Sequence, residues 1–275
     1  MYNSETHIYT HKSLDLDNAS TVSFLCMLYD IPMKNIHFME ADWNNPEDLQ
    51  DILIVDMFSG IKGESKIDSN GNAIILSAFS SILQKLGSPS HKKAFKNLEI
   101  FIDAQDSTGD WRRAYPDVNF SQEVSGLPTI LTVFYALKNI DRDNDFALLQ
   151  KWYSIIYGIQ QSYNMYILAR REAKNAEWYE GFPIAIMRNQ KYPQTTRVLF
   201  GQGAKVIIYT RDYNIGVVRS NMCNVNLGDG LKEFFPSWFC HPAGFLVCWG
   251  SWKAPKAADS GVDPLMLAEL VSRLL

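Results

Sequence analysis

Three short apolar runs near the N-terminus predict β-strands. Residues 8–10 form the first run, residues 35–39 alternate between apolar and polar positions, and residues 51–56 hold four consecutive apolar residues between two aspartates. Three of those four are β-branched, which is typical of a strand that is buried on both faces of a sheet. We therefore predict three strands, of which the last is the clearest.

A helical pattern lies between the first two of these strands. Ala19, Val22 and Cys26 recur at a spacing of three or four residues, so we predict a helix that begins near Asn18 or Ser20. A strand, a helix and two more strands in succession predict an α/β protein built on a parallel, doubly wound sheet.

The middle of the chain predicts mainly helices and loops. We expect an exposed loop over 60–72, a buried helix over 73–83, a helix or helix–strand join over 92–102, a loop over 103–109 and a helix over 126–140. Residues 145–178 carry an apolar or aromatic side chain at nearly every helical turn, which predicts a long helix that bridges two domains. Another core helix of the first domain would give the same pattern.

After residue 181 the pattern changes to short strands. We predict strands over 182–187, 204–210, 215–219 and 245–249, a four-residue hairpin turn over 211–214, and a terminal helix over 263–275 with an aspartate cap and an early proline. The predicted organisation is a first domain over 1–140, a connecting helix over 141–180 and a smaller α/β domain over 181–275.

Composition limits the class of protein. The chain has 275 residues, of which 47% are hydrophobic and 20% charged, a globular mixture that can form a sizeable core. Its four cysteines include no Cys-x-x-Cys pair, which argues against a zinc ribbon. The first ten residues lack the apolar segment of a signal peptide, and no apolar run is long enough for a membrane span. We therefore expect a soluble, cytoplasmic protein with no membrane partner.

The net charge of −4 is unevenly distributed. Residues 181–275 carry 10 Lys and Arg against 6 Asp and Glu, whereas the preceding residues carry 16 against 24. An acidic first part suits a metal ion and a mildly basic second part suits an anionic ligand, although ordinary surface scatter also gives imbalances of this size.

The loop after the first predicted strand carries one imidazole and two carboxylates. His11, Asp15 and Asp17 have the spacing His-x3-Asp-x-Asp, and Asp56 ends the strand over 51–56. Sites in parallel sheets lie beyond the carboxyl ends of the strands, so we expect His11, Asp15 and Asp56 within reach of one divalent ion. Alternatively, Asp15 or Asp17 caps the following helix and His11 is an ordinary strand-end residue.

The order of these motifs resembles the DHH superfamily of phosphoesterases. His11-x3-Asp15-x-Asp17 resembles its first motif, Asp56 resembles its second, and residues 103–109 resemble a later motif that supplies one more carboxylate. Either Asp103 or Asp106 can be aligned with that carboxylate, and we select Asp106. Residues 238–245 are similar to the substrate-domain signature of the melanocyte-proliferating-gene-type branch, whose members resemble RNA exonucleases.

The resemblance implies two metal ions, Mn2+ or Mg2+, but the third motif departs from it. One ion would be held by His11, Asp15 and Asp56, and the other by Asp17, Asp56, Asp106 and a histidine of the third motif. Asp68-Ser69-Asn70 stands where the family has Asp-His-His, so the ligand histidine and the phosphate-contacting histidine are both missing. We therefore expect one complete metal site and an impaired second one. The candidate catalytic residues are Asp56, Asp68 and Asn70.

The resemblance also implies the class of substrate. We expect a divergent metal-dependent phosphoesterase that acts on a phosphodiester of a nucleotide or short RNA. The candidate residues for binding its phosphates are Arg219, His241, Gly244 and Lys253. The alternative is a catalytically inactive protein of the same fold that binds a nucleotide, RNA or protein partner. A third interpretation is a metal-free structural protein whose acidic loops only cap helices.

Overall fold

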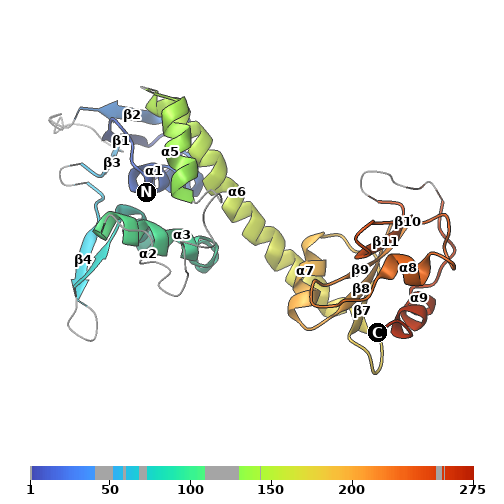
Figure 1. The fold of residues 1–275 in the computed structure, drawn as a ribbon. Helices are drawn as coiled ribbons and strands as arrows, with labels where there is room; N and C mark the ends of the chain where they lie inside the picture. The colour runs from blue at the N-terminus through green and yellow to red at the C-terminus, as the bar shows by residue number, and fades with distance from the viewer. Residues whose placement is uncertain are drawn as a thin grey trace. The chain divides into compact units, whose positions relative to one another are not determined.

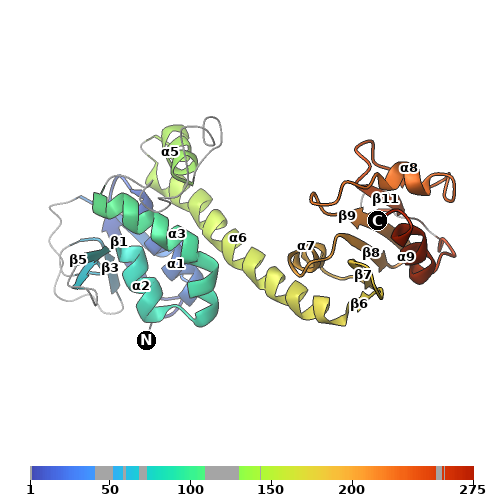
Figure 2. The ribbon, with the colours of Figure 1, turned by 60° about the horizontal axis from the view of Figure 1, so that its bottom comes forward.

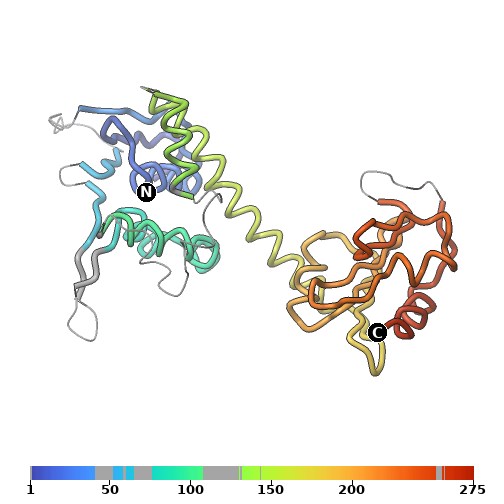
Figure 3. Tube along the Cα trace, in the orientation of Figure 1, coloured from blue at the N-terminus to red at the C-terminus, as the bar shows by residue number. Residues whose placement is uncertain are grey.

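The computed structural model describes residues 2–40, 52–57, 60–67, 73–108, 130–142, 144–251, 256 and 258–275. The chain divides into two compact units, Met1–Ser162 and Tyr163–Leu275, each with a sheet and a hydrophobic core (Figures 1 and 3). The mixed α/β class, with a parallel sheet and a second sheet, is confirmed. The predicted domain limits at residues 140 and 181 stay a prediction. None of the helices in the described ranges has the length and apolarity needed to cross a membrane.

The first unit contains a parallel three-stranded sheet. Its strands are β1 (His7–His11), β2 (Ile36–Met39) and β3 (Ile52–Val55), in the order β2-β1-β3. Ile8 is in register with Ile36 on one side and with Leu53 on the other. The three strands predicted from the apolar runs are thus confirmed, and their carboxyl ends lie at one edge of the sheet, with His11 and Asp56 at two of them.

Helix α1 (Leu16–Tyr29) lies at the centre of this unit and is buried all round from Leu16 to Cys26. Its buried polar side chains have partners in neighbouring elements: the Thr10 hydroxyl donates to Asn18 Oδ1, and the Trp152 indole donates to Ser20. The helix begins two residues before the earliest predicted position because the Asp15 side chain caps it by accepting the N–H of Asn18.

Two sequence predictions in the next segment are wrong. Residues 73–83 form strand β5 (Ala73–Leu76) followed by helix α2 (Ala78–Leu86), not one helix. β5 pairs with β4 (Glu64–Ile67), which lies inside the predicted loop over 60–72. The physical cause is that β-branched residues favour the strand, while the Ser77 side chain accepts the N–H of Ser80 and starts the helix.

Helix α3 (Pro89–Thr108) contains most of the predicted loop over 103–109, so that prediction is also wrong. Buried apolar side chains such as Phe95, Phe101 and Ile102 continue its helical pattern against the core. Figure 2 shows α1, α2 and α3 side by side. The remaining helices of the unit are the short 3-10 helix η1 (Met33–Asn35), α5 (Ile130–Ile140) and the first part of α6 (Asp145–Glu172).

The second unit is built on a six-stranded mixed sheet with the order β10-β11-β9-β8-β7-β6. Its strands are β6 (Glu177–Trp178), β7 (Ile184–Met187), β8 (Val206–Arg211), β9 (Asn214–Arg219), β10 (Phe239–Cys240) and β11 (Leu246–Trp249). Only β7 and β8 are parallel neighbours, and α7 (Gln194–Gly201) lies between them in the chain. The predicted four-residue turn is a two-residue one, because Arg211 pairs with Asn214.

Helices cover both faces of this sheet. One core contains alternate strand residues such as Ile184 and Ile186, together with residues of α8 (Leu227–Leu231) and α9 (Pro264–Ser272). The other core contains Ala185 and residues from α7 and the end of α6. Helix α6 ends at Glu172 and is followed by a 3-10 turn (Ala173–Asn175), so it is shorter than predicted. The terminal helix α9 has the predicted cap, since Asp263 accepts the N–H of Leu265.

Candidate metal site

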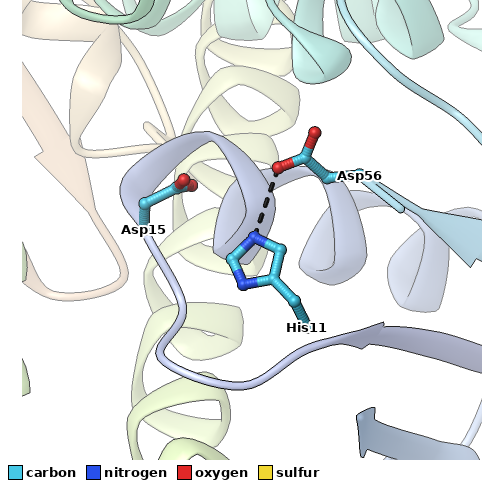
Figure 4. A group of neighbouring side chains, drawn as sticks. All are labelled: His11, Asp15 and Asp56. Carbon is cyan, nitrogen blue, oxygen red and sulfur yellow. Dashed lines mark hydrogen bonds and ion pairs between the residues drawn. The ribbon is translucent and has the colours of Figure 1, made fainter. Parts of the chain in front are cut away.

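Three side chains at or just beyond the ends of two parallel strands converge at the carboxyl edge of the first sheet (Figure 4). His11 ends β1, Asp15 lies in the loop that follows, and Asp56 comes directly after β3. One ligand atom from each of the three lies within 4.8 Å of the other two, and His11 Nε2 is 3.2 Å from Asp56 Oδ2. One imidazole and two carboxylates form a donor set that suits a divalent ion such as Mn2+ or Mg2+.

The protonation of His11 is constrained by its neighbours. Its Nδ1 lies 2.7 Å from the Lys12 carbonyl oxygen, which only accepts hydrogen bonds, so Nδ1 carries a proton. Without a metal ion, Nε2 also needs a proton to donate to Asp56. The hydrogen bond to Asp56 raises the pKa of His11 to about 9, with help from Lys12 and the nearby charges and against the effect of burial. A bound cation would replace the Nε2 proton, while Lys12 would keep the ring oriented.

Asp56 is held by an unusual turn. Its φ of 55° lies in the left-handed region, which aspartate tolerates better than most residues. Its N–H donates to the Ile61 carbonyl at 2.7 Å, and the Ile61 N–H donates to the Ile54 carbonyl at 2.7 Å. Gly60 packs against β3 so closely that a Cβ atom there would lie 2.3 Å from the Ile54 carbonyl oxygen. These two hydrogen bonds hold the Asp56 backbone in place at the end of β3.

Asp15 has two roles at once. Its Oδ1 accepts the N–H of Asn18 at 2.8 Å and caps α1, as the alternative interpretation of this residue predicts. The residue is exposed, and its carboxylate belongs to the three-residue group with His11 and Asp56. A cap and a metal ligand are therefore compatible, because a carboxylate has two oxygens.

A hollow of about 180 Å³ adjoins the group and is lined by three carboxylates, those of Asp15, Asp17 and Asp106. Burial and the charge of Asp15 raise the pKa of Asp106, with smaller contributions from Asp56 and Asp103. Gln105 also lines this hollow, and its Oε1 atom is buried and has no hydrogen-bond partner within the described ranges. Repelling carboxylates and an unpaired carbonyl oxygen both suit a hydrated cation.

Asp17 is buried, and its carboxylate binds the start of α2. Its two oxygens accept the N–H groups of Ala78 at 2.9 Å and Phe79 at 2.8 Å. Burial raises the pKa of Asp17 to about 7 in spite of these two bonds. The structure therefore gives Asp17 a structural task at a helix N-terminus and does not include it in the group of His11, Asp15 and Asp56.

The two alternative acidic residues of α3 have different surroundings. Asp103 Oδ1 accepts the backbone N–H of Ser77 at 2.9 Å and the Ser77 hydroxyl at 2.7 Å. Asp106 is exposed and lines the hollow beside Asp15 and Asp17. Of the two, only Asp106 faces that hollow.

Side chains from distant helices fix the loop that carries the site. The Asp145 carboxylate accepts the N–H of Ser13 at 2.8 Å and of Leu14 at 3.1 Å. The Lys138 ammonium group donates to the Leu14 carbonyl at 2.7 Å. Sequence reasoning missed Lys138, Asp145 and Gln105, because only tertiary packing brings α3, α5 and α6 to this loop. Ser13 itself adopts a φ of 62°, a left-handed conformation that the sequence does not indicate at this serine.

Three of the predicted substrate residues, Arg219, His241 and Gly244, lie at or near the β10–β11 turn. Arg219 donates to the Cys223 carbonyl at 2.6 Å and to the Ser220 carbonyl at 3.2 Å, so its guanidinium binds the backbone. His241 Nδ1 accepts the Ala243 N–H at 3.1 Å, which leaves Nε2–H as a donor. Gly244 has a φ of 65°, and a Cβ there would lie 2.1 Å from Asn226 Oδ1.

Four residues of interest lie outside the described residues: Asp68, Ser69, Asn70 and Lys253. They include two of the three candidate catalytic residues. The expectations for these positions stay predictions.

Comparisons with known proteins give a limited result. No family model and no curated protein matches the sequence. Among solved structures, the chain is similar to RecJ from Thermus thermophilus in complex with Mg2+, at 11% identity and a TM-score of 0.35, over 98% of this chain and 49% of that one. The same protein with Mn2+ gives 11% identity and a TM-score of 0.35, over 98% and 52%.

An uncharacterized protein from Helicobacter pylori has 9% identity and a TM-score of 0.24, over 98% of this chain and 99% of that one. The chain thus spans about half the length of the RecJ chains from Thermus thermophilus that it matches. At these TM-scores the similarity assigns this chain neither a family nor a ligand.

Proposed function

We propose that this protein is a divergent metal-dependent phosphoesterase that acts on a phosphodiester of a nucleotide or short RNA. The observation that carries the proposal is the convergence of His11, Asp15 and Asp56 at the carboxyl edge of a parallel sheet. The DHH-like spacing of the same residues in the sequence supports the phosphoester class of substrate.

The three residues are the proposed ligands of one Mn2+ or Mg2+ ion, with Asp106 as a further oxygen from the adjacent hollow. An ion there would polarise a phosphoryl oxygen and offset the negative charge that develops on it. The Lys12 carbonyl keeps the proton of His11 on Nδ1, so that Nε2 is free to bind the ion. Asp145 and Lys138 hold the loop between His11 and Asp15 in one conformation, which lowers the cost of organising the ligands.

For the substrate, we propose that residues of the second unit bind phosphate groups. His241 supports this best, since its Nε2–H is directed by the Nδ1 hydrogen bond and the residue is partly exposed. Arg219 contributes a positive charge while it holds the backbone around Cys223. Gly244 and Lys253 remain part of the same proposed set.

The test is hydrolysis of a nitrophenyl phosphodiester and of a short RNA with Mn2+. Asp56→Asn should abolish activity, because it removes a charged ligand but keeps a residue that tolerates the left-handed φ. Asp212→Asn is the matched control, since Asp212 also has a positive φ, of 48°, and lies in an exposed turn of the second unit. Equal activity of the parent and Asp56→Asn would refute the proposed site.

A second function is favoured by a specific observation: of the four ligands expected for a second ion, the histidine is missing and Asp17 is engaged elsewhere. Ser69 and Asn70 replace both expected histidines, and Asp17 binds the start of α2. The protein would then bind a nucleotide, RNA or protein partner without cleaving it. Restoration of both histidines, Ser69→His with Asn70→His, distinguishes the hydrolase from the protein that binds without cleavage. Loss of the general acid–base group lowers rates by about 10²–10⁴-fold, so recovery of that size supports the divergent hydrolase. If neither the parent nor the double variant cleaves the substrates, the result supports the binding function.

A further inference from the structure

A cavity of about 640 Å³ lies beside the candidate metal site in the first unit. Lys12 and Ser13, which directly follow His11, form one side of it. The end of α5, residues between α5 and α6, and the first residues of α6 form most of the rest, and Phe38 of β2 completes it. Cavities of roughly 300–1,000 Å³ are the usual size for small ligands.

Most charged side chains around this cavity already have a hydrogen-bond or ion-pair partner. Asp141 accepts two hydrogen bonds from Lys151, both at 2.7 Å, and Asp145 is bonded to the backbone N–H groups of Ser13 and Leu14. Lys12 pairs with Glu40, and Lys138 donates to the Leu14 carbonyl.

Arg142 is the exception among the charged lining residues. It is exposed and has no hydrogen bond or ion pair within the described ranges. A guanidinium group binds phosphate through two parallel hydrogen bonds, so Arg142 offers its unpaired donors to an anion in the cavity.

The other walls suit a planar ring. Phe38 and Phe146 both line the cavity, and Phe146 is 39% exposed although it is a large apolar side chain. Asn139 adds an exposed amide, which can both donate and accept hydrogen bonds. Aromatic side chains stack on nucleobases, and amides bind their polar edges.

We propose that this cavity binds a nucleoside monophosphate, with the phosphate on Arg142 and the base against Phe146. The identity of the ligand as a nucleotide rests on the proposed function, but the anion site rests on Arg142 alone. The ligand would lie next to the loop of His11, so the cavity could hold a terminal nucleotide of the substrate or a product of its cleavage.

The experiment is a calorimetric titration of the full chain with adenosine monophosphate and, separately, with inorganic phosphate, both in EDTA. Arg142→Glu should weaken the binding of both probes by about 10- to 100-fold, the effect of losing hydrogen bonds to a charged group. Phe146→Ala should weaken the nucleotide by about tenfold and leave phosphate unchanged. Lys96→Glu makes the same charge change at an exposed site on α3 and should alter neither.

Two results would overturn the proposal: no binding of adenosine monophosphate by the parent protein, or equal binding by the parent and Arg142→Glu. Equal losses of nucleotide and phosphate in Phe146→Ala would overturn the nucleotide assignment. Because EDTA removes metal ions, these outcomes do not depend on the metal site. Failure of the proposed function, shown by equal activity of the parent and Asp56→Asn, is therefore distinguishable from failure of nucleotide binding in this titration.

Discussion

Substitution of Asp17 by alanine should destabilise the metal-free protein, because this carboxylate binds the start of α2. Two backbone N–H groups, those of Ala78 and Phe79, donate to it and would lose their acceptor. The side chain is 8% exposed, so water cannot easily replace it. If Asp17 acted only as a metal ligand, its removal would leave the metal-free protein unchanged or more stable.

The expected loss can be worked out from these contacts. Removal of an N-terminal capping carboxylate costs about 0.5–2 kcal/mol, and buried donors left without acceptors cost about 1–3 kcal/mol. Part of this is offset at neutral pH, since burial penalises the ionised carboxylate. A net loss of about 1–3 kcal/mol corresponds to a fall in melting temperature of about 3–10 °C for a unit of this size.

The loss should also depend on pH with a definite sign. Burial raises the pKa of Asp17 from 3.8 to about 7, so the native protein keeps a proton that the unfolded chain releases. Its stability contribution is therefore complete below pH 3.8 and falls as the pH rises through 7. Asp17→Ala should cost more at pH 5 than at pH 8.

The assay is thermal and urea unfolding in EDTA, followed by circular dichroism. Asp56→Asn is the control, because Asp56 is partly exposed and its carboxylate bonds a single group, the His11 imidazole, among the residues that the structure describes. It should change the metal-free melting temperature by less than Asp17→Ala. Unchanged stability of Asp17→Ala at pH 5 would show that the assigned structural role is mistaken.

Three further predictions concern the candidate site. The His11 proton stabilises the metal-free protein below pH 6.5, and this stabilisation should be lost as the pH rises through about 9. The test is unfolding of the parent and of His11→Gln in EDTA over this pH range. Identical dependence of stability on pH in the two proteins would contradict the prediction. Gly60→Ala should lower stability by about 1–3 kcal/mol and weaken Mn2+ binding, because the new Cβ overlaps the Ile54 carbonyl, whereas Gly158→Ala, at an open position, should do neither. Asp145→Ala should weaken Mn2+ binding about tenfold, because Asp145 holds the loop after His11 although it is not one of the proposed ligands. Equal Mn2+ affinity of Asp145→Ala and the parent in calorimetry would count against that role.

The sequence predicts the first sheet and part of its site because both depend on local patterns. His11 and Asp56 follow apolar, β-branched runs, and parallel strands bring their carboxyl ends to one edge. This arrangement of parallel strands, together with the short loop from His11 to Asp15, is enough to predict that the three residues converge. Asp15 shows, however, that a cap signal and a ligand signal can belong to the same residue.

The errors arise where local signals are short or contacts are distant. Residues 73–76 are too few to tell a strand from a helix by periodicity, and their pairing with β4 decides the outcome. The acidic residues at 103–106 suggest a loop, but burial of Phe101 and Ile102 keeps them in α3. The task of Asp17 depends on α2, which lies about sixty residues further along the chain, and no local pattern reports that contact.

We propose that His11, Asp15 and Asp56 hold one divalent ion. The most direct measurement is the number and affinity of Mn2+ ions bound by the purified protein, from calorimetry at pH 7.5, compared with Asp56→Asn and with Asp212→Asn. We expect one ion for the parent and for Asp212→Asn, and a Mn2+ affinity at least tenfold lower in Asp56→Asn. Equal Mn2+ affinity in the parent and Asp56→Asn, or no saturable binding by the parent, would contradict it.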